Sequence, residues 1–154
     1  MSPKSLYRLF AVGEAITWGL LISALIARAV VADLGIAVTI AGTIHGAMFL
    51  SYCTTAVLVG VNQRWKFGKI AAAVSLAIVP FATVPLDRSL MKKGQLEGDW
   101  RTQPSDHPSD SGWFDRLFRW FIARPVVLIA TLVLAVVALF SLLLSLGSPT
   151  TWFN

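Results

Sequence analysis

Long apolar runs separated by short polar breaks dominate the pattern of this chain. An α-helix rises about 1.5 Å per residue, so about 20 apolar residues cross the ~30 Å hydrocarbon core of a bilayer. Four runs approach or exceed this length, and they predict helices at residues 6–31, 43–61, 67–86 and 125–146. The predicted fold class is an all-α integral membrane protein, with a three-helix transmembrane bundle, a linker and a fourth, C-terminal transmembrane helix.

The segments between these helices differ in character. The apolar stretch 36–40 is too short to cross a membrane and is predicted to be a loop at the interface. Residues 94–112 are rich in Gly, Pro, Ser and Asp, which indicates a polar flexible linker after a membrane domain at residues 1–93. Residues 113–124 combine aromatic with basic side chains, a composition typical of a helix in the headgroup region.

The predicted third helix contains Pro80 and Pro85, which are expected to kink or end it. These prolines bear on topology because the charges that flank the helices conflict. The first two helices favour a cytoplasmic N-terminus, whereas the fourth helix, basic before it and uncharged after it, favours a cytoplasmic linker. A third helix that does not fully cross would remove the conflict. Four full crossings are the preferred interpretation, and the orientation stays open.

Composition places the chain among membrane proteins. Hydrophobic residues make up 56% and charged residues 14%, with mean hydropathy +0.70, whereas soluble domains carry about 25% charged residues. The net charge of +5 comes from basic residues beside apolar runs, which favours contact with anionic lipid over nucleic acid. The predicted location is the plasma (cytoplasmic) membrane, with a multi-pass topology. The single cysteine, Cys53, cannot form an internal disulfide.

Glu14 stands out because it places a carboxylate within the first apolar run. An ionisable group at such a depth costs roughly 2.5 to 3.5 kcal/mol on insertion scales and usually faces a partner, a cavity or an ion path. Thr17 and Trp18 follow at i+3 and i+4 and share its helix face. Counting depth along antiparallel helices predicts the neighbours of Glu14 on later helices: Thr54, Thr55, Arg64 and Lys69.

The same depth count predicts a second polar cluster at the opposite end of the bundle, formed by Arg28, His45, Asp87 and Arg88. Because His45 begins the predicted second helix, it is expected far from Glu14, and no Glu14–His45 pair is predicted. His45 is interpreted as a hydrogen-bonding residue near the interface. For Glu14 two interpretations stay open: an ion pair or hydrogen bond that fixes helix packing, or a role with an ion, a proton or a ligand.

The sequence offers little that is typical of an active site. It contains no Gly-rich phosphate loop, no nucleophile–base pair and no pair of close carboxylates. The only histidine besides His45 is His107 in the predicted linker, and no Cys/His spacing suits a metal. The chain is therefore predicted to have no catalytic, cofactor-binding or metal-binding residues and not to be an enzyme.

Four short motifs carry a resemblance to a known family. They are Glu14-Ala15-Ile16-Thr17-Trp18, Ile44-His45-Gly46, Gln63-Arg64-Trp65, and Pro80-Phe81-Ala82-Thr83 followed by Asp87-Arg88. In this order and spacing, residues 1–93 resemble the small integral membrane proteins of domain-of-unknown-function family number 3817, although Ala82 stands where members often have glycine. The resemblance implies a three-helix membrane domain and names no activity and no catalytic residue. It also implies kinship with a similar domain that is joined to a transporter-like region in some eukaryotic proteins.

Size, the lack of catalytic motifs and small-residue helix faces such as Ala71-Ala72-Ala73 favour a non-enzymatic accessory or interaction subunit of a larger bacterial membrane protein complex. A respiratory-chain assembly is one candidate host. The expected partners are the lipid bilayer and other membrane protein subunits, and no nucleic acid. The alternative is a small transporter-like or ion-coupling membrane protein that uses Glu14, and an enzyme acting on lipid ranks third.

Overall fold

The computed structural model describes residues 1–31, 34–105 and 112–145, and the residues in these ranges fold into helices joined by turns. The helices are α1 (Pro3–Val30), α2 (Gly35–Asn62), α3 (Phe67–Leu76), α4 (Thr83–Lys92), α5 (Trp113–Ile122) and α6 (Pro125–Ser145). They belong to two compact units, Met1–Trp100 and Arg101–Asn154, and each unit is described by itself.

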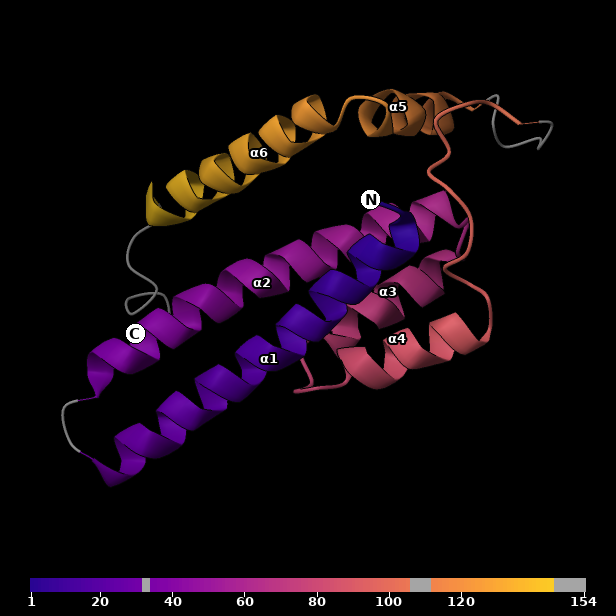
Figure 1. The fold of residues 1–154 in the computed structure, drawn as a ribbon. Helices are drawn as coiled ribbons and strands as arrows, with labels where there is room; N and C mark the ends of the chain where they lie inside the picture. Colours follow the sequence, from indigo (N-terminus) through magenta and orange to yellow (C-terminus); the bar gives the residue numbers. More distant parts are fainter. Residues whose placement is uncertain (32–33, 106–111, 146–154) are drawn as a thin grey trace. The chain divides into compact units, whose positions relative to one another are not determined.

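The first unit is built on a long antiparallel hairpin of α1 and α2 (Figure 1). Each helix has 28 residues, which corresponds to about 42 Å and exceeds the ~30 Å core of a bilayer. Ser2 caps α1, because its side chain accepts a hydrogen bond from the backbone N–H of Ser5 and Pro3 follows at the first helical position. The helices approach closely at Gly13, where an added Cβ would lie 3.0 Å from Met48 Sδ.

The second helix begins at Gly35, so the loop predicted at residues 36–40 and the helix start predicted at residue 43 are wrong. Glycine is common inside transmembrane helices, so Gly42 does not mark a helix start here. The hydroxyls of this early stretch are also satisfied within the helix. Thr39 Oγ1 donates to the Gly35 carbonyl at 3.1 Å, and Thr43 Oγ1 donates to the Thr39 carbonyl at 2.8 Å.

The predicted third helix is two short helices, α3 and α4, each of 10 residues. The break spans residues 77–82, where backbone bonds of the i to i−3 type replace helical ones and Phe81 takes a positive φ of 65° next to Pro80. Pro85 lies in the first turn of α4, where its missing N–H costs no helical hydrogen bond. The break therefore reverses the chain, and Pro85 does not kink a continuous helix.

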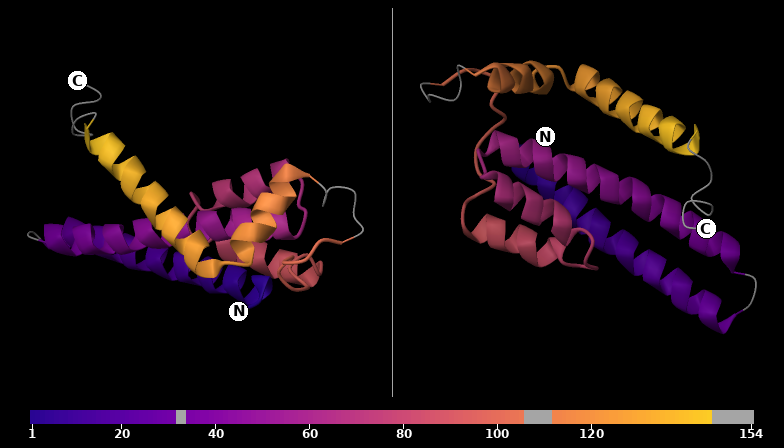
Figure 2. Two further views of the ribbon diagram at one scale, coloured as in Figure 1. Left: turned by 90° about the horizontal axis from the view of Figure 1, so that it is seen from above. Right: turned by 180° about the vertical axis from the view of Figure 1, so that it is seen from behind.

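The helices α3 and α4 pack against one half of the α1–α2 hairpin, the half that contains the N-terminus (Figures 1 and 2). Each is about 15 Å long, about half of a bilayer core. The chain returns to the end from which it left, because the Trp65 indole N–H before α3 donates to the Gln95 carbonyl after α4, at 3.3 Å. The α3–α4 hairpin thus does not provide the predicted third crossing.

Residues 94–100 are packed onto the end of this bundle, so the linker predicted at 94–112 begins too early. Leu96 is fully buried in the core. Lys4 Nζ lies 2.6 Å from Glu97 Oε1, and the Trp100 indole N–H donates to the Met1 carbonyl at 2.9 Å. We call residues 94–100 the end cap. Of the remaining predicted linker, residues 106–111 lie outside the described ranges.

The second unit contains α5 and α6. The helices are bent by 104° at the break between Ile122 and Pro125, and Arg101 pairs with Asp115 at 3.0 Å before the bend. Among the described residues, α1 and α2 are the two helices long and apolar enough to cross a membrane, and the bent pair would make a third span. The structure thus shows an all-helical protein with two clear spans, fewer than the four predicted; the predicted end of the last helix, residue 146, lies outside the described ranges.

Candidate functional site

Glu14 is buried where α1 meets α4, and its exposed fraction is 0%. Thr83, the first residue of α4, places its Oγ1 2.8 Å from Glu14 Oε2 and 2.9 Å from the Ala11 carbonyl oxygen. Within the described residues, the second carboxyl oxygen, Oε1, has no hydrogen-bond partner. The contact of Glu14 with Thr83 thus ties the first transmembrane helix to the start of the returning hairpin.

Thr17 and Trp18 continue this polar site one turn further along α1. Thr17 Oγ1 donates to the Glu14 backbone carbonyl at 2.9 Å and lies 3.1 Å from His45 Nδ1. The Trp18 indole N–H donates to the Ala77 carbonyl at 3.1 Å, and its ring lies 4.4 Å from the His45 ring between centroids. Glu14, Thr17, Trp18, His45 and Thr83 therefore form one contiguous cluster, which we call the Glu14 layer.

The placement of His45 contradicts the prediction that it lies at the opposite end from Glu14. The depth count assumed that His45 begins its helix, whereas α2 begins at Gly35 and His45 lies almost three turns inside it. His45 is buried, 9% exposed, and faces Thr17. The structure joins His45 to the Glu14 layer through Thr17, without a direct Glu14–His45 hydrogen bond.

The predicted partners of Glu14 on later elements lie elsewhere. Lys69 Nζ donates to Gln95 Oε1 at 2.5 Å and lies 3.9 Å from the centroid of the Trp65 ring. Arg64 occupies the turn between α2 and α3, with φ of 53°. Thr54 is half-buried and Thr55 is buried, both on α2. The side chain that Glu14 contacts, Thr83, was not among these predictions.

The other members of the predicted second cluster are dispersed. Arg28 is exposed in the last turn of α1, at the far end of the hairpin. Asp87 and Arg88 lie on α4; Asp87 is buried, 2% exposed, and Arg88 is exposed. Burial raises the pKa of the Asp87 carboxyl, and the positive charges of Arg8, Arg88 and Lys4 oppose that rise. Asp87 thus belongs to the basic end of the bundle.

Sequence reasoning also missed a second polar link, between two tyrosines. Tyr7 and Tyr52 are both fully buried, and their hydroxyl oxygens lie 2.9 Å apart. The Tyr52 hydroxyl donates to the Ala73 carbonyl at 3.2 Å, so this link joins α1, α2 and α3. The signal that could have indicated this link is the position of Tyr7 in an apolar setting, on the same face of α1 as Ala11 and Glu14.

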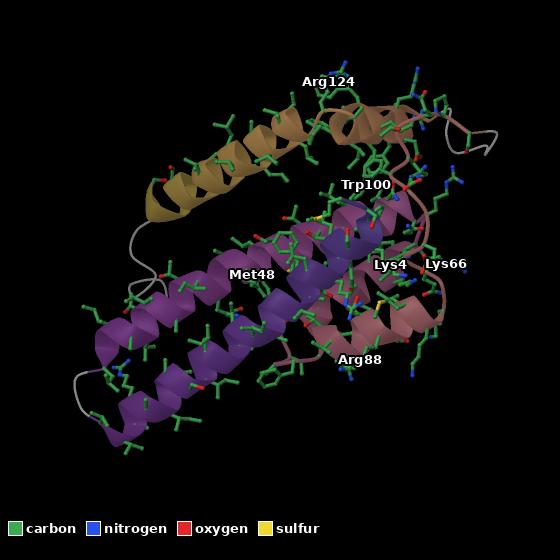
Figure 3. All side chains as sticks on the ribbon, viewed as in Figure 1. Lys4, Met48, Lys66, Arg88, Trp100 and Arg124 are labelled. Atoms are coloured by element: carbon green, nitrogen blue, oxygen red, sulfur yellow. The ribbon has the colours of Figure 1, made fainter. Side chains whose placement is uncertain are left out.

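Basic side chains gather at the end of the bundle where α1 begins and α2 ends. Lys4 and Lys66 lie toward this end, and Met48 lies further along the hairpin (Figure 3). The return of the chain through α4 brings Lys92 and Lys93 to the same end as the end cap. In the described part of the chain, no group of three or more His, Cys, Asp or Glu side chains is placed to hold a metal ion.

Comparison with known proteins gives one curated relative, a protein named "Putative membrane protein SCO5905" from Streptomyces coelicolor. It is 32% identical over 100 residues, which cover 64% of this chain and 11% of the relative. The chain thus spans about a ninth of the length of the relative it matches. No solved structure matches.

The family comparison covers the part of the chain that builds the Glu14 layer. Residues 4–92 match the family described as "Domain of unknown function (DUF3817)". This range runs from the first turn of α1 to the last residue of α4, so it contains Glu14, Thr17, His45 and Thr83. The match covers more than half of the chain, and the chain belongs to this family.

Proposed function

We propose that this protein is a non-enzymatic accessory or interaction subunit of a larger membrane protein assembly. The proposal rests on the observation that α3 and α4 pack against only one half of the α1–α2 hairpin. Within residues 1–100, contacts from the α3–α4 hairpin reach along α1 as far as Trp18 and Gly19. Beyond that point α1 and α2 present large apolar side chains to their surroundings: Leu20, Leu25, Ile26, Val30, Ile36, Ile40 and Ile44.

The relative from Streptomyces coelicolor supports this proposal. Its matching segment amounts to 11% of its length, so a segment of this kind is there one part of a much longer chain. A membrane module that occurs within a longer membrane protein is suited to packing beside other membrane segments. In a bilayer, association of helices depends on side-chain packing, and the uncovered part of the hairpin offers a surface for it.

Enlarging a side chain on the uncovered part of the hairpin is expected to reduce recovery of membrane partners about tenfold, which corresponds to about 1.4 kcal/mol. The variant is Ile40→Trp, and the matched control is Ile16→Trp, because these isoleucines are 56% and 59% exposed and only Ile40 lies beyond the α3–α4 hairpin. The measurement is quantitative mass spectrometry after affinity purification from native membranes in mild detergent, which would also reveal whether the host is a respiratory assembly.

Equal recovery of partners with both variants would contradict the use of this surface. Recovery of the isolated chain alone, under conditions that keep other membrane complexes intact, would contradict the accessory role itself.

A second candidate function is ion coupling through Glu14. It is supported by the complete burial of the carboxyl group and by the unpartnered Oε1. Ionisable groups inside membranes often mark proton or ion pathways. Under this proposal the carboxyl group of Glu14 takes up a proton from water and releases it again during transport.

Glu14→Gln is the variant that tests this second function, because glutamine keeps the size of the side chain and its hydrogen bond to Thr83 while it removes the titratable group. We expect proton flux into proteoliposomes, followed with an internal pH-sensitive dye, to fall at least tenfold in a variant that melts at the same temperature as the wild type. Unchanged flux in a stably folded variant would exclude ion coupling through Glu14.

We also propose that the basic end of the bundle faces the cytoplasm, in a multi-pass protein of the plasma membrane. The return of α4 supports this orientation, because it places the residues before α3 and after α4 at one end of the bundle and so removes the reason for the conflict between flanking charges. Apart from Arg28, the basic residues of the first unit lie in the half of the hairpin covered by α3 and α4 or in the turns beside it: Lys4, Arg8, Arg64, Lys66, Lys69, Arg88, Lys92 and Lys93. An excess of Lys and Arg at one end is typical of the cytoplasmic side.

A further inference from the structure

The hydrogen bonds at Thr83 bear on the protonation state of the Glu14 carboxyl group. A threonine hydroxyl has one hydrogen to donate, yet Thr83 Oγ1 lies within hydrogen-bond distance of two acceptors, Glu14 Oε2 at 2.8 Å and the Ala11 carbonyl at 2.9 Å. If Glu14 is ionised, the one hydroxyl hydrogen of Thr83 can serve Oε2 or the Ala11 carbonyl but not both, although that carbonyl also lies within α1, where the Ala15 N–H is its helical partner. If Glu14 carries a proton on Oε2, it donates to Thr83, and Thr83 donates to Ala11, so both contacts are satisfied.

The tyrosine link nearby shows the same arrangement with protons that are certain to be present. Tyr7 and Tyr52 each carry one hydroxyl hydrogen, and the Tyr52 hydroxyl ends the chain on the Ala73 carbonyl at 3.2 Å. The Tyr7 hydroxyl can therefore donate to Tyr52 at 2.9 Å. In the tyrosine link a hydroxyl on α1 can thus donate to a second hydroxyl, which in turn donates to a backbone carbonyl, and a protonated Glu14 would give the link through Thr83 the same arrangement.

Among the described residues, no cation forms an ion pair with Glu14 that would hold it in the ionised form. Two ion pairs that the structure does show join Lys4 to Glu97 and Arg101 to Asp115. On the elements packed around it, the charged and titratable groups are Lys4, Tyr7, Arg8 and Arg28 on α1, His45, Tyr52 and Cys53 on α2, Lys69 on α3, and Asp87, Arg88 and Lys92 on α4. The positive charges of Arg8, Arg88 and Lys4 act on Asp87, and Lys69 is engaged by Gln95. His45 bonds to Thr17 through Nδ1.

An ionised carboxylate in this place would be buried, without a cation, and with Oε1 lacking any hydrogen bond. Such a charge is among the most costly groups inside a membrane, whereas the carbonyl oxygen of a neutral acid costs far less when it is unpaired. We propose that Glu14 and Thr83 form a proton-binding site, in which the bound proton donates to Thr83 and thereby docks the α3–α4 hairpin on α1.

The test is isotope-edited infrared spectroscopy of the protein in lipid vesicles at neutral pH, with labelled glutamate carboxyl groups. The difference spectrum between wild type and Glu14→Gln is expected to show the loss of one C=O band of a neutral carboxylic acid. Thr83→Val is expected to shift that band to higher frequency, because it removes the hydroxyl that accepts the hydrogen bond. The shift keeps the proposal testable even if Glu14→Gln fails to fold, since Glu14 itself is retained.

Asp87→Asn is the control, because among the described residues of the first unit Asp87 is the other buried carboxyl and also has an oxygen, Oδ1, without a partner. With glutamate-specific labelling this variant is expected to leave the band unchanged. Loss of carboxylate bands alone in Glu14→Gln would overturn the proposal. The outcome is separable from ion coupling, because a carboxyl group that never releases its proton would give the expected spectrum without any flux.

Discussion

Replacing Gly60 with leucine is expected to lower the free energy of unfolding of the first unit by about 3 kcal/mol, the upper end for an overpacked core. Gly60 lies on α2 where α3 crosses it. A Cβ built there would lie 2.7 Å from Ile70 Cγ1 and 3.2 Å from the Trp65 ring, distances at which the neighbours must move. Ile70 can withdraw Cγ1 only by leaving the χ1 rotamer that isoleucine prefers in a helix or by moving α3 itself, and both cost free energy.

The matched control is Gly68→Leu. A Cβ at Gly68 would meet no other atom within 4 Å, although this glycine is also helical. Both variants gain the same intrinsic helix preference, so the difference between them measures the packing of α2 against α3. Unfolding in mixed micelles, followed by circular dichroism, gives both free energies. Equal stabilities would mean that α3 does not pack on α2 at Gly60.

Hydrophobic pattern was enough to predict the helical membrane class and the first helix nearly to its bounds. The predicted range 6–31 and the observed Pro3–Val30 differ at each end by less than one turn. This part was predictable because the length of an apolar run and the thickness of a bilayer are linked by simple geometry. Glu14, Thr17 and Trp18 also share one face, as their spacing requires.

The error at His45 came from a single helix boundary. Reading Gly42 as a helix start changed the depth of His45, counted from that end of the second helix, by about two turns, or about 11 Å. That shift was enough to assign His45 to the wrong end of the bundle. Thr54 and Thr55 were chosen by counting from the opposite end of the helix, against a first helix that begins three residues earlier than predicted. The first and last residues of a helix are the least reliable part of sequence-based prediction, and a depth counted from a wrong helix end is wrong by the same number of residues.

The partner of Glu14 was missed for a different reason. Thr83 follows the irregular stretch at residues 77–82, which contains Pro80, and its position depends on the reversal at Phe81, where φ is 65°. A positive φ at a phenylalanine has no sequence signal comparable to that of glycine. A continuous third helix would have carried Thr83 toward the opposite surface, so only the return of the chain could place it beside Glu14.

The second large effect concerns the side of the membrane on which the end cap lies. If α3 and α4 return, residues before α3 and after α4 must be reached from the same side. If residues 67–86 formed the continuous crossing helix that the sequence predicted, these residues would lie on opposite sides. In a labelling experiment each residue reacts from one side of the membrane or from the other, so the two arrangements predict results that differ almost completely.

The measurement uses single-cysteine variants in a Cys53→Ala background, labelled with a membrane-impermeant maleimide from each side of sealed vesicles. The sites are Lys66→Cys, Lys93→Cys and Ala29→Cys, all exposed, with Ala29 at the far end of α1. The structure predicts that Lys66→Cys and Lys93→Cys react from one side and Ala29→Cys from the other. The proposed orientation makes the first of these sides the cytoplasmic one. Reaction of Lys66→Cys and Lys93→Cys from opposite sides would contradict the returning hairpin and, with it, the contact between Glu14 and Thr83.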